Sequence, residues 1–380
     1  MKKFLKKIIL FVVLFILFNF IIFYTLDNIS SNGQIHKGKF SQITRFLDRS
    51  DRALMKKSYK IDESDNRYYI PGKGLNAAGK KEVENILRKS VLKNSVLDRL
   101  LPYKIWTGTA VAFHKFREIS KFKNIDILFI GSSHAVLGFD PRIFQRYGLT
   151  SFNLAVRGQG PVNSYYLLKM YYKDLRPKIV IIECYFHSLV IDGFESFLYT
   201  LVNHPLHFNV LKMGIDAGGV DGIKAFFIEM VKRLRFPLNK YPVIKSGTYI
   251  PGGYATSNLK NDRNKKIKKI RRKYKLNPLQ LNYYEKILHF CKKKGTAVFL
   301  VTHPLPDVFL EQVVNYEKIS GQIAAVAKKH KVEYLDFNTI MKLDFYEDYK
   351  DMHHLNQGGV EKFNKKLINV LSKFDSFKAL

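Results

Sequence analysis

The sequence is poor in cysteine, tryptophan and acidic residues. Among its 380 residues are two cysteines and one tryptophan, and 32 aspartate and glutamate residues stand against 64 lysine and arginine residues. Two cysteines cannot build a disulfide framework. Cys184 and Cys291 both lie in apolar segments, so we expect small core residues rather than a redox pair.

The shortage of acidic residues leaves a formal net charge of +32. This charge favours an anionic partner, which would be nucleic acid, anionic lipid or an anionic cell-surface polymer. A solvated basic surface without a specific partner explains the charge equally well. Ten of the residues from 260 to 275 are lysine or arginine, and this run either binds phosphates and lipid headgroups or forms an exposed face.

An apolar run, residues 8–26, follows four lysines at the start of the sequence. About 19 residues of helix rise roughly 28 Å, which matches the bilayer core. The lysines should remain cytoplasmic, so we expect residues 1–27 to be an uncleaved, single-pass anchor of the cytoplasmic membrane. The rest of the chain would then be extracytoplasmic, where nucleic acid is not an expected partner. A cleaved signal peptide is the alternative, but no small-x-small cleavage site follows the run.

An alternation of strand and helix patterns begins near residue 124. The strand patterns cover residues 125–130, 151–155, 178–183, 296–302 and 332–337, and helix patterns cover residues 162–172, 279–294, 316–330 and 357–374. Such alternation predicts an α/β domain with a parallel sheet and helices on both faces. We expect this domain over residues 124–380, with a basic, partly helical insertion at about residues 188–277. Residues 28–123 are expected to be a linker and helical extension.

Two short motifs lie at the ends of these predicted elements. Residues 131–133, Gly-Ser-Ser, follow the first strand pattern, and residues 351–354, Asp-Met-His-His, precede the last helix pattern. Reactive groups in an open parallel sheet gather at the carboxyl ends of its strands. A serine there needs a base before it can act as a nucleophile, and His354 with Asp351 would supply the base and its orienting carboxylate. A simple turn is the alternative for Gly-Ser-Ser, and His353 competes with His354.

The order of these motifs resembles the SGNH (GDSL-like) hydrolase superfamily. Ser133 matches the nucleophile of the Gly-Asp-Ser block, Asp351 and His354 match the final Asp-x-x-His block, and Gly158 ends an Asn-x4-Gly segment like that of the second block. The resemblance implies a flavodoxin-like three-layer α/β/α sandwich with a five-stranded parallel sheet. It also implies a Ser133–His354–Asp351 triad, with the backbone N–H groups of Ser133 and Gly158 as oxyanion donors.

The third block of the family, Gly-x-Asn-Asp, has no match. Residues 183–187 read Glu-Cys-Tyr-Phe-His, so the asparagine that donates to the oxyanion is absent and His187 is its candidate replacement. A missing oxyanion donor typically costs about 2.7–4 kcal/mol of transition-state stabilisation. The departure therefore fits a slow or specialised acyl transfer at least as well as general hydrolysis.

The anchor together with both outer motifs also resembles the D-alanyl transfer protein of teichoic acid and the SGNH-like acetyltransferases of exopolysaccharide export. That similarity implies a serine esterase or O-acyltransferase that acts on a cell-surface glycan or anionic polymer beside a membrane-bound O-acyltransferase, without a metal or cofactor. A non-catalytic accessory protein with the same fold is one alternative. A metal site made of Asp351, His353, His354 and His303 is another, although adjacent histidine rings usually point apart.

Overall fold

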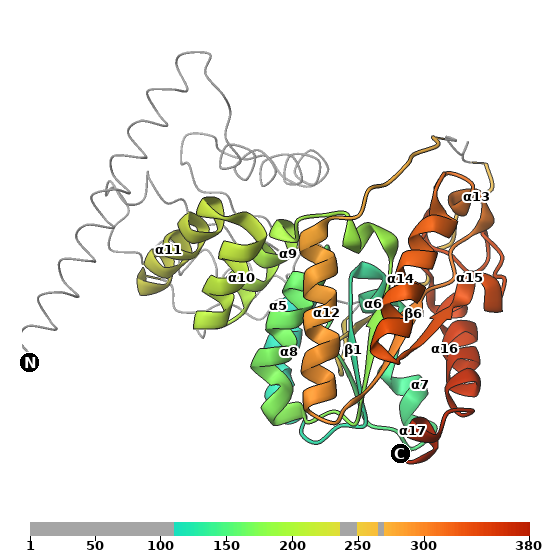
Figure 1. Cartoon of the computed structure of the whole chain (residues 1–380), viewed down its shortest axis with the longest axis horizontal. Helices are drawn as coiled ribbons and strands as arrows, with labels where there is room; N and C mark the ends of the chain where they lie inside the picture. The colour runs from blue at the N-terminus through green and yellow to red at the C-terminus, as the bar shows by residue number, and fades with distance from the viewer. Residues whose placement is uncertain (1–109, 236–248, 265–269) are drawn as a thin grey trace, which may run out of the picture. The chain divides into compact units, whose positions relative to one another are not determined.

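The computed structural model describes residues 110–235, 249–264 and 270–380, and the elements are labelled as in Figure 1. The predicted anchor at residues 1–27 and most of the predicted extension at 28–123 lie outside these ranges. Within the described ranges, the helices are all too short or too polar to cross a membrane. The anchor and the extracytoplasmic location therefore stay predictions.

Five parallel strands form the central sheet, in the order β2-β1-β3-β6-β7. They are β1 (Ile127–Ile130), β2 (Ser151–Asn153), β3 (Ile179–Glu183), β6 (Ala297–Thr302) and β7 (Glu333–Asp336). Each predicted strand pattern thus forms a strand, and the observed strands are slightly shorter. The order of the parallel strands along the sheet corresponds to 2-1-3-4-5, which is the flavodoxin-like order of doubly wound folds.

Helices cover both faces of this sheet (Figure 1). One face carries α6 (Ser133–Gly138), α7 (Pro141–Gln145) and α16 (Gln357–Leu371), with α17 (Asp375–Lys378) after them. The opposite face carries α8 (Pro161–Leu175) and α12 (Pro278–Lys293), with α14 (Tyr316–His330) beside α12. The side chain of Asn356 accepts a hydrogen bond from the backbone N–H of Gly359 and so caps α16, a role for which asparagine is among the preferred residues.

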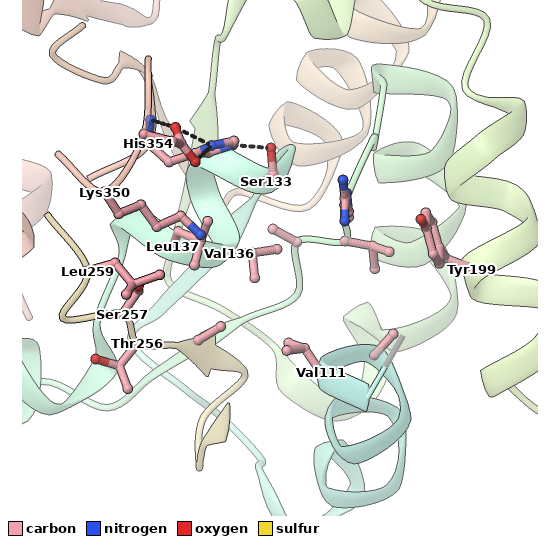
Figure 2. Close-up of a pocket in the computed structure, with 16 residues that line it drawn as sticks. Val111, Ser133, Val136, Leu137, Tyr199, Thr256, Ser257, Leu259, Lys350 and His354 are labelled. Carbon is pink, nitrogen blue, oxygen red and sulfur yellow. Dashed lines mark hydrogen bonds and ion pairs between the residues drawn. The ribbon is translucent and has the colours of Figure 1, made fainter. Parts of the chain in front are cut away.

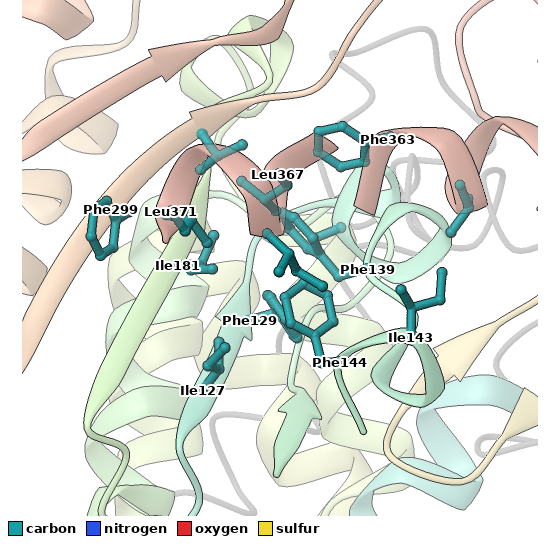
Figure 3. Close-up of a cluster of buried hydrophobic side chains, with 14 of the residues drawn as sticks. Ile127, Phe129, Phe139, Ile143, Phe144, Ile181, Phe299, Phe363, Leu367 and Leu371 are labelled. Atoms are coloured by element: carbon teal, nitrogen blue, oxygen red, sulfur yellow. The ribbon is translucent and has the colours of Figure 1, made fainter. Parts of the chain in front are cut away.

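The hydrophobic core lies between the sheet and helices α6, α7 and α16 (Figure 3). Successive strand residues point to opposite faces, so Ile127 and Phe129 both face these helices. The ring of Phe129 stacks on Phe139 with centroids 4.5 Å apart and contacts Phe144 at 4.9 Å. Strand β3 is buried at all of its positions, which confirms the prediction that both of its faces are covered. Cys184 and Cys291 are buried free thiols, as expected for core residues.

The 3-10 turn η4 (Phe186–Leu189) leads into the predicted insertion, whose described residues form three helices and a hairpin. These are α9 (Phe194–Asn203), α10 (Phe208–Gly218), α11 (Val220–Arg235), and the antiparallel pair β4 (Tyr249–Ile250) and β5 (Tyr254–Ala255). The hairpin returns to the sheet edge, where Gly252 O accepts a hydrogen bond of 2.7 Å from Asn153 N. Two single-turn helices, α13 (Asp307–Leu310) and α15 (Phe337–Ile340), follow strands β6 and β7.

One helix before the predicted domain boundary at residue 124 belongs to the α/β body. Helix α5 (Ala110–Glu118), which continues as the 3-10 turn η3 (Ile119–Lys121), packs against α9 and the β4–β5 hairpin. Its residues Phe113 and Phe116 are buried. The described end of the predicted extension is therefore part of the core packing rather than a spacer.

Phe129→Ala tests the importance of the aromatic contacts in this core. Removing a fully buried ring leaves a cavity, so we expect the free energy of unfolding to fall by about 3–5 kcal/mol. Chemical denaturation measures this change. Phe208→Ala is the matched control, because the Phe208 side chain is 64% exposed and its loss should change stability by no more than about 0.5 kcal/mol. Equal effects of both substitutions would contradict the described core.

Candidate functional site

The turn after β1 is held by a carboxyl from the neighbouring strand β3. Glu183 Oε2 accepts hydrogen bonds from Ser132 N at 3.0 Å and from Ser132 Oγ at 2.8 Å. Gly131 has a φ of +149°, and a Cβ at this position would lie 2.5 Å from the Cβ of Glu183. Only glycine fits so close to a buried side chain. The turn thereby leads directly into α6, whose first residue is Ser133.

The loop before α16 folds back on itself and presents its side chains towards this turn. Tyr349 and Leu355 form an antiparallel bridge, and Lys350 N donates to His354 O at 2.9 Å. At the tip of the loop, Asp351 Oδ1 accepts hydrogen bonds from the backbone N–H groups of His353 at 3.1 Å and His354 at 2.9 Å. Aspartate favours such local turns, and this turn places the carboxylate beside an imidazole three residues later.

Ser133, His354 and Asp351 form a continuous hydrogen-bonded chain (Figure 2). Ser133 Oγ lies 2.8 Å from His354 Nε2, and His354 Nδ1 lies 2.9 Å from Asp351 Oδ2 and 3.0 Å from Asp351 Oδ1. Partial burial would raise the pKa of Asp351, but the hydrogen bond and charge of His354 and the two backbone N–H groups together lower it well below its usual range. The carboxylate is therefore ionised at neutral pH and can stabilise a charged imidazole.

The predicted oxyanion donors lie on two segments that border this chain. No described residue accepts a hydrogen bond from the backbone N–H of Ser133 or of Gly158. Gly158 has a φ of +63° in the loop after β2, and residues 155–157 of the same loop line a cavity together with Ser133. In the described structure both backbone N–H groups thus have no hydrogen-bond acceptor, and each is available to donate to a substrate oxygen.

His187 lies away from the cavity. It belongs to η4, and its ring approaches Tyr274 with centroids 6.0 Å apart and Tyr185 at 6.1 Å. It is not among the described residues that line the cavity beside Ser133. The structure therefore supplies no contact that would let His187 replace the missing asparagine.

A stack of aromatic rings that the sequence does not reveal supports His354 from one side. The ring of His134 stacks on His354 at 4.6 Å and lies 3.7 Å from the ring of Tyr185, and His134 Nε2 is 3.1 Å from His353 Nδ1. Burial, followed by the charge of His354, lowers the pKa of His134 and brings the pKa of His353 to about 4. Both rings are therefore neutral at pH 7. The sole sequence signal for His134 is its position next to Ser133.

The positions of the histidine rings also test the alternative of a metal site. Ligand atoms of His134, His353 and His354 lie within 4.8 Å of one another. However, His134 Nε2 and His353 Nδ1 already face each other at 3.1 Å, and His354 Nε2 faces Ser133 Oγ at 2.8 Å. The planes of His353 and His354 lie at 27° and 29° to that of His134 and at 48° to each other. His303 is packed between Phe139 and Phe363 at 4.7 and 4.5 Å. The geometry favours a hydrogen-bonded imidazole stack over metal ligation.

Ser133, His354 and Asp351 open into a cavity of about 410 Å³. Figure 2 shows its walls, which come from α5, α6, the loop after β2, α9, β5 with the segment after it, and the loop before α16. Val111, Val136 and Leu137 give it an apolar lining. A cavity of this size accommodates a small ester or the reacting end of a larger one.

Comparison with known proteins gives structural but no sequence matches. No family model and no curated protein matches the chain. Solved structures that match include a GDSL-like lipase from Bacteroides thetaiotaomicron, with 11% identity, 69% of this chain and 98% of that chain covered, and a TM-score of 0.35. TesA matches with 15% identity, coverage of 65% and 98%, and a TM-score of 0.35. The acetyl xylan esterase AlAXEase matches with 12% identity, coverage of 65% and 99%, and a TM-score of 0.32. These scores are below 0.5, so the chemistry rests on the site geometry alone.

Glu183→Gln tests the buried carboxyl through the pH dependence of stability. Burial raises the pKa of Glu183 from the ordinary 4.5 to about 7, so the folded protein keeps a proton that the unfolded chain releases above about pH 4.5. The corresponding stability, on the order of 3 kcal/mol, is present below pH 4.5 and is lost as the pH rises towards 7. Unfolding at pH 5 and pH 7.5 should therefore show a smaller pH effect in the variant than in the native protein. An unchanged pH effect would contradict this assignment.

Proposed function

We propose that this protein is a serine esterase or O-acyltransferase with Ser133 as its nucleophile. The observation that carries the proposal is the hydrogen-bonded chain from Ser133 Oγ through His354 to Asp351. Ser133 and His354 lie 221 positions apart in the sequence, yet their reactive atoms are 2.8 Å apart. A serine, a base and an orienting carboxylate in this order are the parts required for nucleophilic acyl chemistry.

The reaction proceeds in two halves. Ser133 Oγ attacks the carbonyl carbon of an ester while His354 Nε2 accepts the hydroxyl proton, and Asp351 stabilises the imidazolium that forms. The backbone N–H groups of Ser133 and Gly158 donate to the oxyanion. His354 then returns the proton to the departing alcohol, which leaves an acyl group on Ser133. In the second half, His354 accepts a proton from water or a sugar hydroxyl as that oxygen attacks the acyl-enzyme, and then returns the proton to Ser133 Oγ.

Water in the second half gives hydrolysis, and an acceptor hydroxyl gives transfer. The described residues that line the cavity include no asparagine or glutamine, and His187 is not among them. A less stabilised oxyanion slows both halves, which suits a dedicated transferase more than a general esterase.

The predicted anchor at residues 1–27 leads us to propose an extracytoplasmic, membrane-attached enzyme. Its substrate would be a cell-surface glycan or wall polymer, and its partner a membrane-bound O-acyltransferase that supplies acyl groups. The net charge of +32 is compatible with an anionic polymer. A non-catalytic accessory protein of the same fold is the alternative, and reactivity of Ser133 distinguishes the two.

Ser133→Ala is the direct test. A fluorophosphonate probe should label the native protein, because an activated serine attacks phosphorus as it attacks a carbonyl. Labelling should disappear in Ser133→Ala, and esterase activity should fall by about 10⁵-fold or more. Ser132→Ala is the matched control, because it removes only the hydroxyl bond to Glu183 and keeps the bond from Ser132 N to the same carboxyl; it should still be labelled. Absence of labelling in folded native protein would favour the accessory role.

The neighbouring histidines provide a second matched pair. His354→Gln removes the base and should lower kcat/KM for ester hydrolysis by roughly 10⁴-fold. His353→Gln leaves the Ser133–His354–Asp351 chain in place, so its kcat/KM should stay within about tenfold of the native value. Steady-state kinetics of both variants measures the difference. A larger loss in His353→Gln than in His354→Gln would show that the base is assigned to the wrong ring.

A further inference from the structure

Two cationic side chains line the cavity beside Ser133. Arg157 comes from the loop after β2, and Lys350 comes from the loop that carries Asp351 and His354. Figure 2 shows the Lys350 side chain extending below the Ser133–His354 pair in this view, and Lys350 lines the cavity. Both charges thus belong to the same space that the reacting ester has to enter.

No described residue forms a hydrogen bond or an ion pair with the ammonium of Lys350 or the guanidinium of Arg157. Partial burial lowers the pKa of Lys350, the negative charge of Asp351 opposes this change, and the positive charge of Arg157 adds a smaller lowering. Lys350 is half-buried and Arg157 is exposed at the rim of the same cavity. A part-buried ammonium loses hydration, and a ligand of opposite charge in the cavity would offset that loss.

The carboxylate of Asp351 is not free to act as the counter-charge of Lys350 and Arg157. Asp351 is the one acidic residue among the described residues that line the cavity. Its carboxylate already accepts hydrogen bonds from the imidazole of His354 and from two backbone N–H groups. In the reaction its negative charge balances the imidazolium of His354. Among the described residues that line the cavity, Arg157 and Lys350 consequently have no carboxylate apart from Asp351, which is already hydrogen-bonded to His354.

We infer that Arg157 and Lys350 form a subsite for an anionic group, a carboxylate or a phosphate, on the ester whose carbonyl Ser133 attacks. This inference rests on the proposed function and defines the substrate class more closely. The apolar wall formed by Val136 and Leu137 lowers the local dielectric and strengthens the attraction. Arginine can bind either oxyanion through two parallel hydrogen bonds, and lysine acts as a point charge.

Matched glycerol esters test the inference. The neutral reference is 1-acetylglycerol, and the anionic esters are 3-acetylglyceric acid, 1-acetylglycerol 3-phosphate and glycerol monosuccinate. The first two anionic esters distinguish a carboxylate from a phosphate on the alcohol side, and the third places the carboxylate on the acyl side. We expect kcat/KM for at least one anionic ester to exceed that of the neutral ester about tenfold or more, since a charge-assisted hydrogen bond is worth at least that factor.

Variants separate a local subsite from the general basic charge of the chain. Lys350→Met and Arg157→Met should each reduce the anionic-to-neutral ratio of kcat/KM by about tenfold. Lys366→Met removes the same charge from an exposed position on α16 that does not line the cavity, and the ratio should stay as in the native protein. Inorganic phosphate and succinate should also slow fluorophosphonate labelling of Ser133 in native protein, and less so in Lys350→Met.

Three results decide the matter. Equal kcat/KM for the four esters, with labelling of Ser133 indifferent to phosphate and succinate, would overturn the subsite and leave the serine chemistry standing. A preference that Lys350→Met and Lys366→Met alter equally would also overturn it, because long-range charge would then be sufficient. If Ser133 is neither labelled nor active on any ester, the subsite falls together with the proposed function.

Discussion

The buried carboxyl of Glu183 ties the ends of two adjacent strands together, and the position of Ser133 depends on it. Its two hydrogen bonds to Ser132 fix the turn at the end of β1. Gly131 leaves room for this carboxyl where any side chain would collide. A buried carboxyl that satisfies several donors is costly to disturb, so the turn is rigid. Ser133, the first residue of α6, therefore holds its hydroxyl in a fixed position facing His354 in the loop before α16.

The opposite side of the site is made rigid in another way. The loop that carries His354 is closed by the Tyr349–Leu355 bridge and by the Asp351 turn. The ring of His134 stacks on His354, and the ring of His353 packs against it in a tilted arrangement. Burial keeps those two rings neutral, and of the three imidazoles His354 is the one whose ring nitrogen pairs with a carboxylate, that of Asp351. The neighbouring rings thus restrict the orientation of the base, and the carboxylate orients it towards Ser133.

The fold could be predicted from sequence because central strands buried on both faces leave unbroken apolar runs, as in β3. The meeting of Ser133, His354 and Asp351 followed from their places at strand and helix ends. Glu183 and His134 could not be recognised, because a partner supplied by a neighbouring strand leaves no periodic signal. His187 lies near the missing asparagine in sequence, but η4 places its ring beside Tyr274. A position near the missing asparagine in the sequence is therefore a poor guide to the role of His187, because that role depends on the direction of its side chain.

Helix α5 shows why the residues before the α/β domain matter to the chemistry. Its Lys115 is fully buried and donates a hydrogen bond to the carbonyl oxygen of Ala155, the residue that opens the loop with Arg157 and Gly158. Burial lowers the pKa of Lys115 to about 7 despite the opposing charge of Glu118, yet an amine and an ammonium both donate to a carbonyl. The contact therefore persists whether or not the proton is bound. One buried lysine in this way fixes the loop that holds both the proposed oxyanion donor and half of the proposed anion subsite.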